Sequence, residues 1–281
     1  MAGPVGMIAG RGLLPVHLAR TLRARGREVI LAEMNGFPAD NPDGLDLIPF
    51  RVEKLGALFK ALRKAGVQEL VFAGAVGRPQ IDARKFDLKT MTLAPKFVSA
   101  IKGGDDGLLR TVLGIFEGEG FTIRAAHDLA PDLLPKPGIL TAAQPSDRDR
   151  KDAARAARIV SVLAAADVGQ GAVVAQGQAL AIEAAPGTDR MLAHVAQIAD
   201  ACRPNPDGAR GVFFKGPKPG QDRRIDLPVI GVDTVARVAE AGLAGIVIEA
   251  EGVMVLDRDE VVRRADVAGL FLWVRPAGDS T

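Results

Sequence analysis

The amino-acid sequence is poor in the residues on which several classes of protein site depend. Its 281 residues include one cysteine, three histidines and no tyrosine. The single Cys202 excludes an intramolecular disulfide and a CxxC metal site, and the widely spaced His17, His127 and His194 match no paired zinc motif. Without tyrosine, the chain also lacks the Tyr-x-x-x-Lys pair of short-chain dehydrogenases.

The sequence also lacks a large excess of charge of either sign, and it lacks long hydrophobic runs. Lysine and arginine total 36 against 34 acidic residues, a formal net charge of +2, which argues against a strongly cationic nucleic-acid binder. No run approaches the ~20 apolar residues that span a bilayer, and no signal peptide is recognisable, so we expect a cytoplasmic protein. Hydrophobic residues make up 48% of the chain, and its length favours two domains.

The N-terminal segment has the pattern of strand, glycine-rich turn and helix. An apolar strand at 5–8 precedes a helix at 14–25, with Gly6-x-x-x-Gly10-x-Gly12 across the turn. Glycines let a backbone approach a pyrophosphate, and a helix N-terminus offers N–H groups and positive dipole. We therefore expect substrate phosphates near Gly10, Arg11, Gly12 and Leu13. Glycine-rich first turns also occur in domains that bind nothing, and that alternative stays open.

The β–α alternation continues through the first half. Glu33 ends a second strand, where an acid often receives a ribose hydroxyl. The strand at 69–72 leads to a second glycine-rich loop, in which Gly74 and Ala75 are candidate ligand-binding residues. Repeated β–α units predict a mostly parallel sheet covered on both faces. The fold class predicted is α/β: a Rossmann-like parallel-sheet domain at 1–131, a Pro- and Gly-rich linker at 132–146, and a second, distinct α/β domain at 147–281.

Three further polar residues of the first half are candidates for substrate contact. Asp105 and Asp106 follow glycines at the start of a predicted helix, where either could be an N-cap, or the pair could hold Mg²⁺ or a ligand hydroxyl. Arg124 follows a predicted strand. We include all three among the candidate substrate-binding residues.

In the second half, the apolar segments 172–175 and 179–183 predict a hairpin, and 191–201 a helix. Gly187, Thr188 and Asp189 precede that helix. Thr188 and Asp189 are plausible N-caps; alternatively the three residues meet a phosphate or a metal ion. A strand at 271–274 is expected to close the sheet.

The most informative stretch is the charged loop that follows the apolar strand at 212–214. Proline and glycine shape this loop, and it carries Lys215, Asp222, Arg224 and Asp226. Cations of this kind neutralise phosphate oxygens, and carboxylates hold a hard cation such as Mg²⁺. A solvated turn with surface ion pairs is the alternative.

Four motifs together resemble the UDP-2,3-diacylglucosamine pyrophosphatases of the LpxI type, over essentially the whole chain. They are Ile8-Ala9-Gly10-x-Gly12-x-Leu14-Pro15, Gly104-Asp105-Asp106-x-Leu108-Leu109-Arg110, Glu183-x-x-x-Gly187-Thr188-Asp189, and Lys215-x-x-Lys218-Pro219-x-Gln221-Asp222-x-Arg224-x-Asp226-Leu227-Pro228-x-Ile230-Gly231. One departure is Ala185-Pro186, where the family pattern favours a further acid, so at that place the resemblance supports metal binding by Asp189 alone.

The resemblance implies Mg²⁺-dependent hydrolysis of UDP-2,3-diacylglucosamine to UMP and 2,3-diacylglucosamine 1-phosphate, with water attacking the sugar-side phosphorus. This is a step of lipid A biosynthesis at the cytoplasmic face of the inner membrane, with peripheral membrane contact. Lys215 and Arg224 are then the expected phosphate ligands, and Asp226 the essential carboxylate, as metal ligand or as the group that orients water, with Asp222 second. The Mg²⁺ ligands expected are Asp226 and Asp189.

Two other functions compete with this interpretation. A non-catalytic sensor or carrier of a nucleotide-linked lipid would need the glycines but not so dense a charged loop. An NAD(P)-dependent oxidoreductase would fit the Rossmann-like start, although no hydride-transfer constellation is visible. The sequence does not give the assembly state, and a homodimer is kept as a working assumption.

Overall fold

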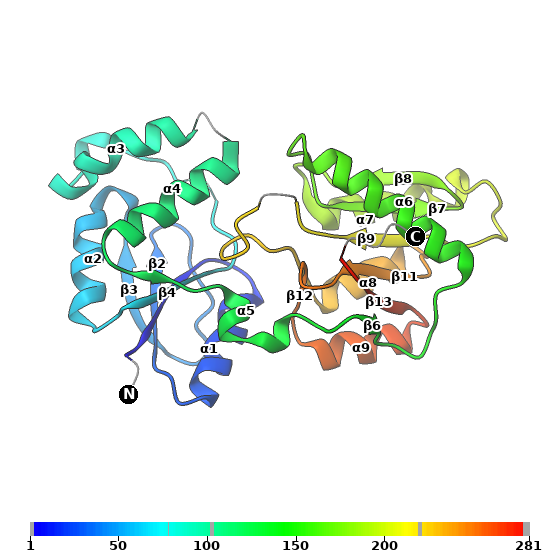
Figure 1. Cartoon of the computed structure of the whole chain (residues 1–281), viewed down its shortest axis with the longest axis horizontal. Coiled ribbons are helices and arrows are strands. Elements are labelled where there is room, and N and C mark those ends of the chain that lie inside the picture. Colours follow the sequence, from blue (N-terminus) through cyan, green and yellow to red (C-terminus); the bar gives the residue numbers. More distant parts are fainter. Residues whose placement is uncertain (1–2, 78, 102–103, 219–220, 278–281) are drawn as a thin grey trace. The chain divides into compact units, whose positions relative to one another are not determined.

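The computed structural model describes residues 3–77, 79–101, 104–218 and 221–277, and the chain forms two compact units (Figure 1). Unit 1 contains Met1–Pro131 together with Asp222–Asp226. Unit 2 contains Asp132–Gln221 and Leu227–Thr281. A five-residue segment from the middle of the second half therefore belongs to unit 1, whereas the sequence pattern had placed it within the domain at 147–281.

Unit 1 is built on a five-stranded parallel sheet with the order β3-β2-β1-β4-β5. Its strands are β1 (Val5–Ala9), β2 (Val29–Met34), β3 (Asp46–Phe50), β4 (Glu69–Ala73) and β5 (Thr122–Ile123). In the register, Ala9 lies beside Glu33 and Ala73, so both glycine-rich loops leave the same edge of the sheet. The predicted Rossmann-like parallel sheet is confirmed.

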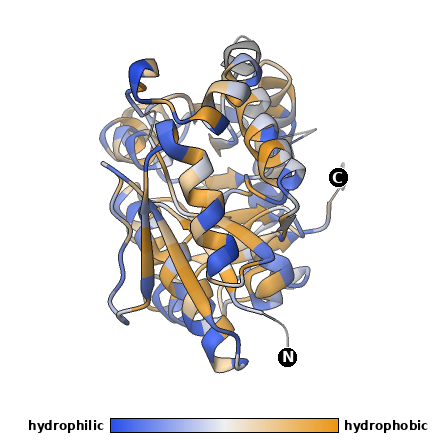
Figure 2. Ribbon diagram, turned by 90° about the vertical axis from the view of Figure 1, so that its left-hand side faces the viewer, coloured by the Kyte–Doolittle hydropathy of each residue, from blue (hydrophilic) through white to orange (hydrophobic). Residues whose placement is uncertain are grey.

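Helices cover both faces of this sheet. They are α1 (Leu13–Ala24), α2 (Leu55–Lys64), α3 (Leu88–Ile101), α4 (Gly104–Gly118) and the short α5 (Ala126–Leu129). In Figure 2, hydrophobic and hydrophilic residues alternate along the helices nearest the viewer, as expected for helices with one buried side. On the α2–α4 face, Phe59 and Phe116 pack edge to face with their ring centroids 5.2 Å apart. Helix α3 was not predicted, and Pro95 in its interior is the residue that obscures its helical pattern.

Unit 2 has a six-stranded mixed sheet with the order β6-β13-β11-β9-β7-β8. Its strands are β6 (Gly138–Ile139), β7 (Gly171–Ala175), β8 (Gln178–Ile182), β9 (Val212–Lys215), β11 (Gly245–Glu249) and β13 (Phe271–Arg275). Strands β9, β11 and β13 are parallel, and β6, β7 and β8 run antiparallel to their neighbours. A separate parallel pair joins β10 (Val229–Ile230) to β12 (Met254–Val255).

Successive side chains of β9 pack on opposite faces of this sheet. Val212 and Phe214 pack in the core beneath α6 (Asp147–Ala164), whereas Phe213 packs in the core shared with the remaining helices. Those helices are α7 (Gly187–Cys202), α8 (Val232–Glu240) and α9 (Arg258–Val267). The second, distinct α/β domain is thus present as predicted.

Three local expectations need correction. The expected linker at 132–146 contains β6, which pairs antiparallel with β13. Strand β13 is therefore internal and does not close the sheet. Helix α7 begins at Gly187 with Pro186 as its N-cap residue, so Thr188 and Asp189 lie in its first turn and neither is the N-cap.

The predicted hairpin of β7 and β8 is confirmed, and a buried carboxylate holds its turn. Gln176 and Gly177 both have positive φ, 53° and 83°, as a tight two-residue hairpin turn requires. Their N–H groups each donate a 2.7 Å hydrogen bond to the carboxylate of Asp152, which is 1% exposed. Helix α6 thereby fixes the conformation of the turn.

Candidate functional site

The two glycine-rich loops of unit 1 bind each other. The N–H of Gly10 donates to the Ala73 carbonyl at 2.8 Å, and Arg11 and Ala75 exchange two backbone hydrogen bonds of 2.9 Å. A Cβ atom on Gly10 would lie 2.5 Å from the Ala75 oxygen, and one on Gly74, where φ is +88°, would lie 2.7 Å from the Arg11 oxygen. These glycines are required for the approach of one loop to the other, and the N–H groups of Gly10, Arg11 and Ala75 are already used.

The N-terminus of α1 is the part of the first loop that still offers hydrogen-bond donors. Gly12 is the N-cap residue with φ 102°, and no side chain caps the helix. Nothing lies within 4 Å of a Cβ built on Gly12, and the first helical residue, Leu13, is 55% exposed. The first turn of α1 therefore has no side-chain cap, and the N–H groups of Leu13 and Leu14 are candidate donors to an anion, whereas Pro15 has none.

Other candidates of unit 1 have structural partners. Arg124 forms an ion pair with Glu69 at 2.6 Å, and Glu69 also pairs with Arg27 at 2.6 Å. Because Glu69 begins β4, this pair lies at the amino end of the strand, on the edge opposite to the glycine-rich loops. Glu33 accepts a 2.9 Å hydrogen bond from the Ala39 N–H and so orders the loop after β2. Asp105 and Asp106 lie in the first turn of α4, and their side chains fall outside the described part of the chain.

The segment Asp222–Asp226, which we call the docked segment, is anchored to unit 1 by Arg224. The Arg224 guanidinium bonds both carboxylate oxygens of Asp222, at 3.0 and 2.7 Å, and reaches Glu117 of α4 at 2.5 Å. Ile225 packs against the hydrophobic core of unit 1. The hydrogen bond from Arg224 holds the pKa of Asp222 below its ordinary value, and Asp222 in turn raises the pKa of Arg224. Asp226 ends the segment, half-buried, with its N–H bonded to the Asp222 carbonyl at 3.1 Å.

In unit 2, three side chains form what we call the buried lysine cluster: Glu183, Thr188 and Lys215. The Lys215 ammonium donates a 2.6 Å hydrogen bond to the Thr188 hydroxyl, which lies 2.9 Å from one Glu183 oxygen. Lys215 is 6% exposed and Glu183 is 8% exposed. Burial lowers the pKa of Lys215, and the charges of Glu183 and Asp189 oppose that shift.

The second oxygen of Glu183 lies 4.0 Å from the Lys215 ammonium and, among the described residues, accepts no hydrogen bond. Gly171 makes room for it, because a Cβ there would lie 2.6 Å from that oxygen. The sequence motif contains Glu183, but the pattern assigned it no role. A lone acid after an apolar strand carries no signal of burial, so only the structure reveals its partnership with Lys215.

The remaining candidates surround this cluster. Gly187 begins α7 with φ 83°, which places Thr188 over the end of β9. Asp189 is exposed, and an oxygen of its carboxylate lies 3.6 Å from Arg237 of α8. The structure therefore gathers the charged and α7 candidates into two groups, apart from the glycine-rich loops: Asp222, Arg224 and Asp226 in unit 1, and Gly187, Thr188, Asp189 and Lys215 in unit 2.

Metal clusters and membrane-spanning helices are absent from the described part of the chain. Within it, no three His, Cys, Asp or Glu side chains gather closely enough to hold a metal ion by themselves. Among the helices that the structure describes, none combines the length and apolar character needed to cross a bilayer.

The chain is thus a two-unit α/β protein, with a Rossmann-like parallel sheet in unit 1 and a mixed sheet in unit 2. The family model described as the LpxI N-terminal domain matches residues 4–133, and the LpxI C-terminal domain matches residues 136–273. The chain belongs to the LpxI family. A relative from Caulobacter vibrioides, named UDP-2,3-diacylglucosamine pyrophosphatase LpxI, is 41% identical over 268 residues, which cover 95% of this chain and 96% of the relative.

Solved structures give weaker similarities. The enzyme WbmG of Bordetella bronchiseptica, in complex with NAD and UDP, is 14% identical with a TM-score of 0.32, over 100% of this chain and 84% of that one. The UDP-glucose 4-epimerase of Thermus thermophilus, in complex with NAD, is 15% identical with a TM-score of 0.33, over 98% of this chain and 88% of that one. Similarities at this level support no conclusion about function.

Proposed function

We propose that the chain hydrolyses the pyrophosphate bond of UDP-2,3-diacylglucosamine, giving UMP and 2,3-diacylglucosamine 1-phosphate in lipid A biosynthesis. The observation that carries this proposal is the 41% identity, over nearly the full length of both chains, to the Caulobacter protein of that name. In support, Lys215 in unit 2 and Arg224 in unit 1 are each held in place by hydrogen bonds within their own unit.

Phosphoryl transfer depends on positioning and charge neutralisation more than on covalent catalysis. Lys215 has three N–H donors and gives one to Thr188, so further donors are available for a phosphate oxygen. Arg224 has five N–H donors, and its hydrogen bonds to Asp222 and Glu117 use three of them. In the proposal both side chains bind pyrophosphate oxygens, while Thr188 and Asp222 hold them in the required orientation.

Asp226 is the proposed essential carboxylate. It orients the attacking water toward the sugar-side phosphorus, or holds Mg²⁺, and UMP is the leaving group. The candidate Mg²⁺ ligands are Asp226 and Asp189, and phosphate oxygens and water would complete the coordination shell of a bound ion. When bound, the metal would neutralise charge that develops on the transferred phosphoryl group.

The lipid part of the substrate implies peripheral contact with the inner membrane. Exposed apolar side chains of unit 2, among them Val162 at 67% and Val267 at 79% exposed, are available for such contact. In the proposal the acyl chains lie on apolar surface of unit 2. In the proposal the nucleotide phosphate lies at the N-terminus of α1, where no side chain caps the helix.

The test is incubation of the pure protein with UDP-2,3-diacylglucosamine in water enriched in heavy oxygen, with Mg²⁺ or with EDTA. We expect UMP only with Mg²⁺, and the label on the lipid phosphate. Label on UMP instead would retain the hydrolase and overturn the proposed site of attack. Saturable binding without any UMP would favour the carrier, and a nicotinamide-dependent absorbance change would favour an oxidoreductase.

A further inference from the structure

Helix α6 of unit 2 carries three cations in a row on its outer face. Lys151, Arg155 and Arg158, which we call the cation row, follow one another at spacings of four and three residues, so they project from one side of the helix. All three side chains are exposed. The apolar residues that α6 buries lie on its opposite side and are Ala153, Ala156, Val160 and Ala164. The cation row therefore points away from the core of unit 2.

The acids of α6 do not compensate the cation row. Asp149 is buried and takes part in the capping box at the helix start, and Asp152 is buried and holds the hairpin turn. Asp147 is exposed but lies in the first turn, at the end of the helix. Among the described residues, no hydrogen bond or ion pair joins the cation row to another side chain. The three positive charges are therefore available to a partner.

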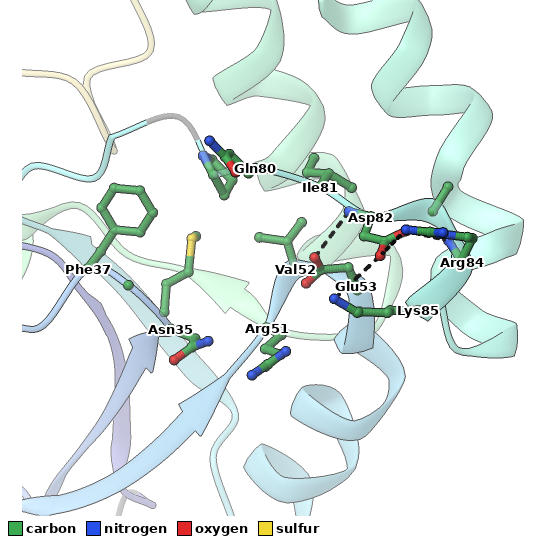
Figure 3. A pocket seen from close by; sticks show the side chains of 14 residues that line it. Asn35, Phe37, Arg51, Val52, Glu53, Gln80, Ile81, Asp82, Arg84 and Lys85 are labelled. Carbon is green, nitrogen blue, oxygen red and sulfur yellow. Dashed lines mark hydrogen bonds and ion pairs between the residues drawn. The ribbon is translucent and has the colours of Figure 1, made fainter.

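Exposed arginines elsewhere in the chain show the contrast. At the pocket of unit 1 drawn in Figure 3, Arg84 bonds the Asp82 carboxylate at 3.0 Å. On α9, Arg263 and Arg264 each bond Glu260 at 2.7 Å. Ion pairs of this kind leave little net charge on a surface, whereas the cation row presents charge of one sign.

The cation row is unfavourable for the helix by itself. Lys151 and Arg155 are four residues apart, and Arg155 and Arg158 are three apart. Like charges at these spacings are neighbours on a helix surface and repel each other. An anionic partner would offset this repulsion, so the arrangement favours binding over stability of the helix.

An exposed apolar side chain extends the same face of α6. Val162 follows Arg158 by four residues and is 67% exposed, and Val168, beyond the end of the helix, is 38% exposed. Cations next to an apolar side chain match the surface of a bilayer, where lipid phosphates border the acyl chains. Nucleic acid also offers phosphates, but the cation row includes no aromatic side chain on which a base could stack. The chemistry of this face therefore favours a bilayer.

We propose that the cation row and Val162 dock unit 2 on an anionic lipid bilayer, with the cations at lipid phosphates and Val162 at the border of the acyl chains. The inference rests on the proposed function for its choice of a membrane, and it gives the peripheral contact a defined surface and a lipid charge. Contact through three charges and one apolar side chain is reversible, and it weakens when salt screens the charges.

The experiment is sedimentation of the full chain with vesicles of phosphatidylcholine, or of phosphatidylcholine mixed with the anionic phosphatidylglycerol. The test variant combines Lys151→Ala, Arg155→Ala and Arg158→Ala. The matched control loses the same charge from exposed positions of α9 and combines Arg258→Ala, Arg263→Ala and Arg264→Ala. We expect wild type and control to bind the anionic vesicles alone. The test variant should bind them on the order of 10²-fold more weakly, because each cation near such a surface contributes about fivefold.

Urea denaturation separates docking from a structural role. Alanine favours a helix and removes the repulsion within the cation row, so the test variant should be at least as stable as wild type. Should it be less stable, Arg155→Gln, which removes a single exposed charge, decides the matter. It should weaken binding to anionic vesicles about fivefold, and unchanged binding would overturn the proposal.

The outcomes separate this inference from the proposed function. Equal binding of test variant and control, or equal binding of wild type to neutral and anionic vesicles, would overturn the docking surface. Binding of single-stranded RNA in place of the vesicles would overturn the choice of a bilayer. Hydrolysis of UDP-2,3-diacylglucosamine dispersed in detergent is measured in parallel, and there the test variant should equal wild type. Failure of wild type in that assay would overturn the hydrolase, whereas hydrolysis without vesicle binding would overturn only the docking surface.

Discussion

The Lys215 ammonium and the Thr188 hydroxyl lie 2.6 Å apart, joined by a hydrogen bond between the end of β9 and the first turn of α7. This contact holds a buried cation at the positive end of a helix dipole, an unfavourable position for it by itself. Glu183 and Asp189 provide the compensating negative charge. Such a cation would interact strongly with a phosphate ligand, because burial weakens its interaction with water.

Replacing Lys215 tests its proposed contact with the pyrophosphate. Lys215→Ala should lower kcat by roughly 10²–10³-fold, the usual effect of removing one donor that stabilises developing charge. Steady-state kinetics on the UDP-linked lipid measures it, and far-ultraviolet circular dichroism checks the fold. A change of less than about threefold would argue against the contact.

Replacing Glu183 by glutamine should change the pH dependence of the reaction. The charged form of Lys215 is lost as pH rises through its pKa, which burial already lowers and Glu183 partly restores. In Glu183→Gln that pKa falls further, so the alkaline limb of the pH–rate profile should move to lower pH. Asp200→Asn, an exposed acid of α7, is the control. An unmoved alkaline limb would show that Lys215 does not act as a cation in the reaction.

Asp226→Ala should abolish most turnover while leaving the fold intact. Loss of a residue that orients water or holds a metal typically costs about 10²–10⁴-fold in rate. Single-turnover measurements should show substrate bound but not cleaved. Asp233→Ala, an exposed acid at the start of α8, should retain full activity. Near-normal kcat in Asp226→Ala would remove Asp226 from the mechanism.

Two glycines with positive φ should respond differently to alanine. Gly74→Ala combines a left-handed conformation with a Cβ placed 2.7 Å from a backbone oxygen, whereas Gly12→Ala meets no atom within 4 Å. Both should lose about 1–3 kcal/mol of unfolding free energy to conformation, and Gly74→Ala about 1–3 kcal/mol more to overpacking. Urea denaturation measures the difference, and equal losses would contradict the close approach of the two loops.

Asp152→Ala should destabilise unit 2 by about 2 kcal/mol, since two N–H groups of the hairpin turn lose their acceptor. Asp147→Ala, exposed in the first turn of the same helix, should cost no more than about 1 kcal/mol. Urea denaturation of both variants gives the comparison. A smaller loss for Asp152→Ala than for Asp147→Ala would contradict the role assigned to the turn.

Much of the architecture could be predicted because it depends on local pattern. Short apolar runs between glycine-rich turns predicted β1, β2 and β4 and their parallel pairing. Helix α3 was not predicted because Pro95 interrupts its helical sequence pattern. The site was harder to predict, since its partnerships are long-range: Arg224 and Glu117 are 107 residues apart, and nothing near either residue indicates the other.

Because of the docked segment, the two units cannot be exchanged between relatives as two continuous pieces of sequence. Its five residues are fitted to unit 1, yet they are encoded between two stretches of unit 2. In a hybrid with residues 1–131 from one relative and the remainder from another, the docked segment and the α4 that it contacts would come from different proteins. Recombination after residue 131 should therefore disturb the contact between Arg224 and Glu117 unless both parents carry compatible residues there.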